Sequence, residues 1–173
     1  MEISLLTPKC ALVPAHFFEP DSAREALGEV VRLENKDEIK SVGIPQYDAV
    51  LVYADSVEGK YSKEIDENVS GEGTGALPEM FYILRDLGKC PEYNKILATY
   101  ADGWLFLAIA QGNSLLLSNV YEAQDFTTAE YFIFLAMKSL QLNPEVSTIY
   151  WRKPIGAEDE MTLYRYFKAV DRI

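Results

Sequence analysis

Two adjacent residues, Asp102 and Gly103, stand between two apolar runs of the chain. A glycine in a turn lets backbone amides approach a phosphate closely, and an aspartate can hold the water molecules of a bound metal ion. This pair is therefore a candidate site for ATP with magnesium. Against this, Trp104 stands where a small or hydroxylated residue would suit the chemistry. Because Asp-Gly between apolar runs is first of all a hairpin signal, the sequence favours a plain turn.

Asp102 and Glu130 are also two candidates for a two-metal nuclease site, which needs three or four converging carboxylates. The next predicted strand, Thr148 to Trp151, supplies no acid. Glu130 is explained instead by a capping box, because Thr127 precedes it by three positions. We therefore expect no nuclease.

A glycine-rich stretch, Gly71 to Gly75, resembles a phosphate-binding loop. It is not a GxGxxG motif after a strand, and the acids around it would repel phosphate. The alternation of Asp66, Asn68 and Ser70 suggests a calcium loop, but Leu77 stands where the bidentate glutamate belongs. The whole polar, glycine-bearing segment from Ser56 to Gly75, which includes the acidic stretch Glu58 to Gly75, is predicted to be a mobile loop.

Nucleophilic catalysis has little support, because His16 is the only histidine and no serine or cysteine lies in a recognised nucleophile motif. Cys10 and Cys90 lie in no metal-ligand spacing, and we interpret them as reduced structural thiols, although the sequence leaves a disulfide open. No catalytic residue and no metal ligand are assigned, and the interpretation leans away from an enzyme.

The charge of the chain excludes several partners. Sixteen basic and 27 acidic residues give a net charge of −11, which repels phosphate backbones and anionic lipid surfaces. The densest cationic cluster is the pair Arg152 and Lys153. We expect no nucleic acid and no membrane partner. Residues 1 to 15 lack a signal peptide's pattern, and no run reaches about 18 apolar residues, so a cytoplasmic location is expected.

The second half of the chain has the most regular pattern. Three apolar runs, Ile96 to Ala101, Trp104 to Ala110 and Leu115 to Tyr121, are separated by two-residue turn signals and predict an antiparallel meander. Because the middle run is apolar at every position, it belongs inside the sheet. The segment Thr128 to Leu142 predicts a helix that is apolar nearly all round and therefore buried on more than one side. A right-handed crossover would then lay the strand Ile149 to Trp151 parallel to the first strand.

The remaining segments are assigned more briefly. Apolar residues from Met161 to Val170 predict a last helix. In the first half, short strands are expected over Ile3 to Leu6, Cys10 to Val13 and Ala49 to Tyr53, with a polar stretch over Asn35 to Ser41. Helices are expected from Pro20 to Arg32 and from Pro78 to Leu87.

Several phrases of the chain resemble a bacterial family, the domain of unknown function 3822. They are Cys10 to Pro14 with Phe17-Phe18, the run Trp104 to Asn119, Thr128 to Phe132, and Leu140 to Glu145. The resemblance implies a fold of the actin-like, ribonuclease H-like type and no established activity. Because members of the family are usually longer, with extra strands ahead of the match to Leu12-Val13-Pro14, it also implies an incomplete first lobe.

These observations predict an α/β protein of the ribonuclease H-like (actin-like ATPase) superfold. Residues 1–90 would form a smaller, incomplete N-terminal α/β lobe, and residues 91–173 a ribonuclease H-like lobe with a mixed sheet. The function predicted is a non-catalytic binding or assembly module, with a protein partner or self-association and no cofactor. The alternative is an ATPase-like protein that binds a nucleotide with Asp102 and Gly103 in an interlobe cleft near Gly156.

Overall fold

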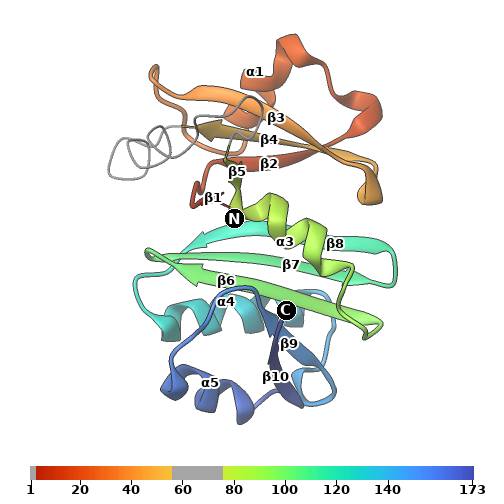
Figure 1. Ribbon diagram of the computed structural model, residues 1–173, viewed down its shortest axis with the longest axis vertical. Coiled ribbons are helices and arrows are strands. Elements are labelled where there is room, and N and C mark those ends of the chain that lie inside the picture. The colour runs from red at the N-terminus through yellow and green to blue at the C-terminus, as the bar shows by residue number, and fades with distance from the viewer. Residues whose placement is uncertain (1–2, 56–75) are drawn as a thin grey trace. The chain divides into compact units, whose positions relative to one another are not determined.

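The computed structural model describes residues 3–55 and 76–173 and divides the chain into two compact units, residues 1–82 and 83–173 (Figure 1). The division falls within helix α3 (Glu79–Leu87). The limits predicted from the sequence, 1–90 and 91–173, stay a prediction of the domain organisation. The segment Glu58 to Gly75, with its phosphate-loop and calcium-loop interpretations, lies outside the described residues.

The first unit contains a three-stranded antiparallel sheet in the order β2-β4-β3, with α1 over it (Figure 1). A two-residue parallel pair joins β1 to β5. Leu27 of α1 packs with Val52 and Ala54 of the central strand in a small apolar core. The elements are β1 (Ser4–Leu5), β2 (Cys10–Pro14), α1 (Ala23–Gly28), β3 (Glu38–Ile44), β4 (Ala49–Asp55) and β5 (Leu77–Pro78), with 3-10 turns at Ala15–Phe17, Pro20–Ser22 and Pro45–Tyr47.

Strands β2 and β4 confirm the predictions for these segments, and the structure differs from the sequence analysis at three other places in the first unit. The helix expected from Pro20 to Arg32 is regular only as far as Gly28, and Val30 beyond it is 64% exposed. The polar stretch from Asn35 contains most of strand β3, which lies at a sheet edge where polar side chains face water. Pro78 pairs with Leu5 in β5, so α3 begins at Glu79.

The second unit holds a five-stranded mixed sheet in the order β10-β9-β6-β7-β8. The first three strands in sequence form the predicted meander, with β7 between β6 and β8, and residues 105 to 110 of β7 are all fully buried. Helix α4 then leads to β9, which runs parallel to β6 as predicted. The elements are β6 (Asn94–Ala101), β7 (Trp104–Gln111), β8 (Ser114–Glu122), α4 (Phe126–Ser139), β9 (Thr148–Trp151), α5 (Ala157–Tyr164) and β10 (Ala169–Arg172), with a 3-10 turn at Pro144–Val146.

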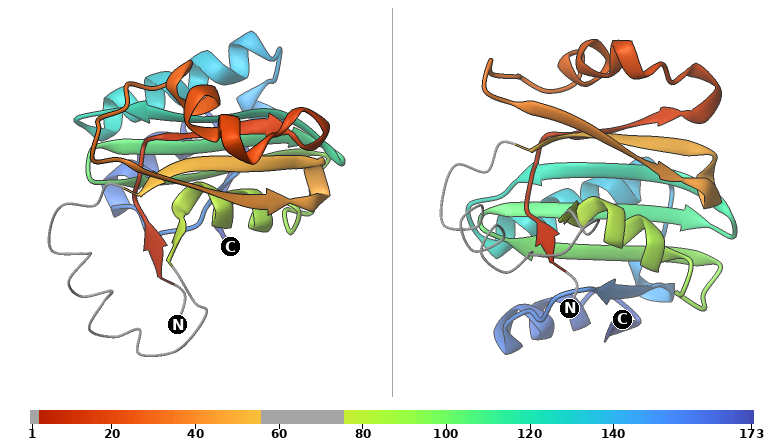
Figure 2. Two further views of the ribbon diagram at one scale, coloured as in Figure 1. Left: turned by 90° about the horizontal axis from the view of Figure 1, so that it is seen from above. Right: turned by 45° about the horizontal axis from the view of Figure 1, so that its top comes forward.

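Helices α4 and α5 share one apolar core with the sheet. Ile133 and Met137 of α4 and Leu163 of α5 are fully buried there together with Trp151. Figure 2 shows α4 running along one face of the sheet. The prediction of a last helix reaching Val170 was wrong: α5 ends at Tyr164, and Val170 belongs to strand β10, which pairs in parallel with β9.

Candidate functional site

The predicted site residues Asp102 and Gly103 form the turn between β6 and β7. Both have positive φ, +52° and +76°, as a type I′ hairpin turn requires. The Gly103 carbonyl accepts a hydrogen bond from the Ala123 amide at 2.8 Å, and the Ala123 carbonyl accepts one from the Tyr100 hydroxyl at 2.8 Å. The turn is thus tied to the end of β8, while Asp102 is exposed. Its role as a nucleotide site stays a prediction.

The second candidate acid, Glu130, has a different local role from the one predicted. The side chain of Asp125, not Thr127, caps α4 by accepting a hydrogen bond from the Thr128 amide at 2.7 Å. Hydrogen bonds to Thr128 hold the pKa of Asp125 below its ordinary value. The Glu130 carboxylate instead accepts a hydrogen bond from the Thr162 hydroxyl of α5. The predicted capping box was therefore wrong, and Glu130 joins two helices.

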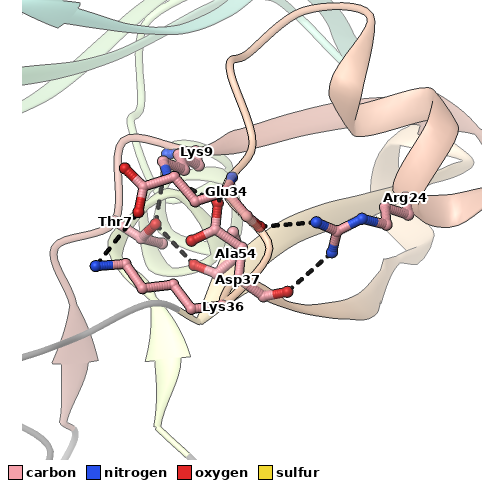
Figure 3. A network of polar contacts seen from close by, with 7 residues as sticks. All are labelled: Thr7, Lys9, Arg24, Glu34, Lys36, Asp37 and Ala54. Carbon is pink, nitrogen blue, oxygen red and sulfur yellow. Dashed lines mark hydrogen bonds and ion pairs between the residues drawn. The ribbon is translucent and has the colours of Figure 1, made fainter.

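A polar network in the first unit is centred on the buried carboxylate of Asp37 (Figure 3). Its Oδ2 atom lies 2.7 Å from the Lys9 ammonium group and accepts a hydrogen bond from the Glu34 amide at 2.8 Å. Arg24 of α1 donates to the carbonyls of Asp37 and Glu34, at 2.9 and 2.7 Å. These contacts hold α1 and the segment before β3 together, which is a structural task.

A cationic cluster in the second unit also surrounds a buried acid. Arg85 and Lys89 each place a nitrogen 2.8 Å from Oδ1 of Asp86, and Arg152 lies 3.7 Å from Oδ2. Burial alone would raise the pKa of Asp86, but the hydrogen bonds from Arg85 and Lys89 outweigh it, and the pKa lies below its ordinary value. Arg152, which the sequence analysis grouped with Lys153, thus contributes to an internal ion-pair cluster.

The most unusual surface of the second unit is the side of α4 that points away from the sheet. Tyr131, Phe134, Leu135 and Lys138 follow one another at helical spacing, and we call them the outer face of α4. Tyr131 is 60% exposed and Leu135 is 46% exposed. The sequence predicts that this helix is buried on more than one side. The prediction holds only in part, because the side facing the sheet and the flank towards α5 are covered, whereas Tyr131 and Leu135 are exposed.

A hollow of about 470 Å³ opens at the C-terminal end of α4. It is lined by Phe134, Met137, Lys138, Gln141, Leu142, Asn143 and Pro144. The ring of Phe134 packs against the rings of Tyr166 and Phe167, with centroid distances of 5.0 and 5.7 Å. Tyr166 remains 52% exposed. Outer face and hollow together form a continuous surface that is largely apolar.

Comparisons with known proteins agree with the architecture. The model of a family described as "Protein of unknown function (DUF3822)" matches residues 2–170. A crystal structure from Bacteroides thetaiotaomicron, of a protein with an actin-like ATPase fold and unknown function, is similar with a TM-score of 0.73 and 11% sequence identity. The similarity covers 96% of this chain and 65% of that one. No curated protein matches the chain. These matches establish the actin-like, ribonuclease H-like fold predicted from the sequence.

Proposed function

The chain belongs to the family of proteins of unknown function DUF3822, and we propose that it acts as a non-catalytic binding module whose docking surface is the outer face of α4. One observation carries the proposal: in a helix that is apolar nearly all round, the side that carries Tyr131 and Leu135 is left exposed. Helices that are apolar all round are normally buried on all sides. A partner that covers Tyr131 and Leu135 would complete this burial.

The composition of the outer face supports a protein as the partner. Aromatic side chains are enriched in the buried centres of protein interfaces, where charged residues are depleted. Tyr131, Phe134 and Leu135 are apolar or aromatic, and Lys138 is the one charged member of the face. Removal of this apolar surface from water favours association by about 25 cal/mol per Å². The net charge of −11 disfavours nucleic acid as an occupant.

The proposal assigns no reaction to the chain. Asp102 and Gly103 have the conformation that the hairpin itself requires, and Glu130 is explained by its bond to Thr162. Within the described ranges, every helix falls short of the length and apolarity that a bilayer crossing requires. We place the module in the cytoplasm, as the sequence analysis suggests.

Photocrosslinking in the native cell tests this function. A photoreactive phenylalanine analogue at position 135 is compared with the same analogue at position 30, where Val30 is also exposed but lies in the first unit. We expect a defined crosslinked protein from position 135 that is lost when Tyr131→Ser is added. Identical crosslinked products from both positions would contradict the proposal.

A further inference from the structure

The outer face of α4 has a projecting side chain near one end and the hollow at the other. Tyr131 is 60% exposed, and Lys138, which lines the hollow, follows seven residues later. Seven residues of helix span about 10 Å, or two turns, so both features lie on one side of the helix. A surface that carries both a projection and a recess is able to pair with its own copy, because in a two-fold interface residue i contacts j and j contacts i.

We propose that the occupant of the outer face is a second copy of this chain, with the two α4 helices antiparallel across a two-fold axis. This inference rests on the proposed function and names its partner. The Tyr131 ring of each copy enters the hollow of the other, beside Phe134 and Gln141. Two equivalent contacts form, one at each end of the helix pair.

The position of the two-fold axis decides which residues of the two α4 helices lie opposite each other. A two-fold axis that crosses α4 between Phe134 and Leu135 places Tyr131 of one copy opposite Lys138 of the other. The Lys138 ammonium group then lies at the tyrosine ring, where a cation is attracted to the negative face of the π-system. Leu135 meets Phe134 of the other copy at the centre. Each exposed apolar side chain of the outer face thus gains an apolar or aromatic neighbour.

The lack of acids on the outer face is compatible with self-association. Two copies with a net charge of −11 repel each other, so pairing is most favourable where acids are absent. The outer face carries no acid, and Lys138 is its only charge. Repulsion between the remaining surfaces is screened by salt, with a Debye length of about 8 Å at physiological ionic strength. We therefore expect salt to strengthen the dimer, whereas a basic partner would bind less tightly in salt.

The available area is adequate only for a weak dimer. An aromatic side chain buries about 200 Å² when fully covered, so Tyr131 and Tyr166, at 60% and 52% exposure, together still offer roughly 200 Å². Leu135, 46% exposed, adds apolar area on α4. Even with Lys138 and Gln141 at the rim, this area is below the roughly 800 Å² per partner of a standard interface, so we expect a weak dimer.

Sedimentation of the full chain tests the dimer. Over about 1 to 100 μM we expect the mass to rise from that of one 19.5 kDa chain to twice that mass. Tyr131→Ser and Leu135→Glu should each weaken the dimer by about 30-fold or more, as expected for central interface residues. The matched controls Phe17→Ser and Val30→Glu change exposed apolar residues of the first unit and should leave it unchanged. Dimers that survive both α4 substitutions would overturn the proposal.

Disulfide crosslinking tests which residues of the two helices lie opposite each other. Its readout is the formation of a covalent bond and not a loss of binding. Chains with Tyr131→Cys and chains with Lys138→Cys should crosslink when mixed and oxidised, and neither should crosslink alone, because like positions are about 10 Å apart along the paired helices. Crosslinking of Tyr131→Cys alone, at the rate of the mixture, would overturn the antiparallel pairing.

The failures of the two proposals are distinguishable. A chain that stays monomeric in sedimentation, while position 135 crosslinks to one different protein in the cell, would overturn self-association and leave the docking surface in place. A monomer whose position 135 gives only the products of position 30 would overturn both.

Discussion

The hydroxyl of Thr162 on α5 donates a hydrogen bond to the carboxylate of Glu130 on α4. The bond joins the two helices above the apolar core that they share, near Leu163 and Ile133. Because both residues are partly buried, neither polar group is fully solvated if the other is removed. The contact therefore helps to fix the position of α5 beside the outer face of α4.

Replacement of Thr162 by valine keeps the shape of the side chain and removes the donor. We expect the free energy of unfolding in urea to fall by about 1.5 kcal/mol, because the Glu130 carboxylate loses a partner in a partly buried place. Thr127→Val on α4 is the control, since Thr127 is exposed and Asp125 makes the cap. Its effect should stay within about 0.5 kcal/mol. Equal losses in the two variants would contradict this role of Glu130.

The order of elements in the second unit could be predicted from the sequence because its signals are local. Asp102-Gly103 sets a turn whatever surrounds it, and the unbroken apolar run of β7 is explained only by a strand covered on both faces. With a right-handed crossover, these signals place β9 parallel to β6. The prediction of this order of elements therefore used local sequence signals and no information about long-range contacts.

The errors occur where tertiary contacts decide the outcome. Strand β3 lies at a sheet edge, so its apolar pattern is weak, and the apolar residues Leu163, Phe167 and Val170 fit a helical period although a strand supplies the last one. For the docking surface, the apolar pattern of α4 shows that both sides of the helix favour burial. It does not show whether the second side is covered by this chain or by another molecule, and Leu135 on that side is 46% exposed.

The ion-pair cluster around Asp86 should make stability depend on pH. Its pKa is lower in the folded chain than in the unfolded one, so the unfolded state takes up the proton first as the pH falls. The stabilisation by Asp86 is complete above its ordinary pKa of 3.8 and is lost as the pH falls through the lower folded value.

Asp86→Asn tests this dependence. At neutral pH we expect the free energy of unfolding to fall by about 3 kcal/mol, because Arg85, Lys89 and Arg152 lose their shared counter-charge. The slope of the free energy of unfolding against pH should become shallower in acid. Asp171→Asn, at an exposed position of the same unit, is the control and should change little. If the slope of the free energy of unfolding against pH in acid were the same in Asp86→Asn, carboxylates other than Asp86 would account for the pH dependence.

From the conformation of the turn between β6 and β7 we expect two neighbouring substitutions to change the stability of the chain by unequal amounts. Gly103→Ala should lower the free energy of unfolding by about 1 kcal/mol or more, because a φ of +76° is unfavourable for a residue with a Cβ atom. Asp102→Asn should be nearly neutral, since asparagine also adopts positive φ readily. Gly43→Ala serves as the control, because its added Cβ meets no atom within 4 Å and its φ is negative. Chemical denaturation of the three variants measures the differences.

The same turn offers a test of the nucleotide alternative. If Asp102 and Gly103 held ATP with magnesium, millimolar nucleotide would raise the melting temperature of the chain by mass action. For a binding module of the kind proposed, we expect no increase. An increase that occurs in the parent chain and disappears in Asp102→Asn would favour the nucleotide-binding function over the one proposed here.

The two thiols should be nearly unreactive in the folded chain. Cys10 and Cys90 are free, and burial raises the pKa of each to about 12. At pH 8 about one thiol in 10⁴ is then ionised, and the thiolate is the reactive form. A colorimetric disulfide reagent should therefore react with both thiols in concentrated guanidinium chloride and far more slowly without it.

The dependence of the free energy of unfolding on pH is a second, independent measurement for these thiols. Because the folded chain holds both protons more tightly than the unfolded chain, the unfolded state loses its protons first as the pH rises above about 9. The free energy of unfolding should then decrease with rising pH, and Cys90→Ala should remove part of this decrease along with one reactive thiol. Rapid native labelling of Cys90 would show instead that the segment around it opens often, and the slope at high pH would then report that opening rather than the burial of the thiol.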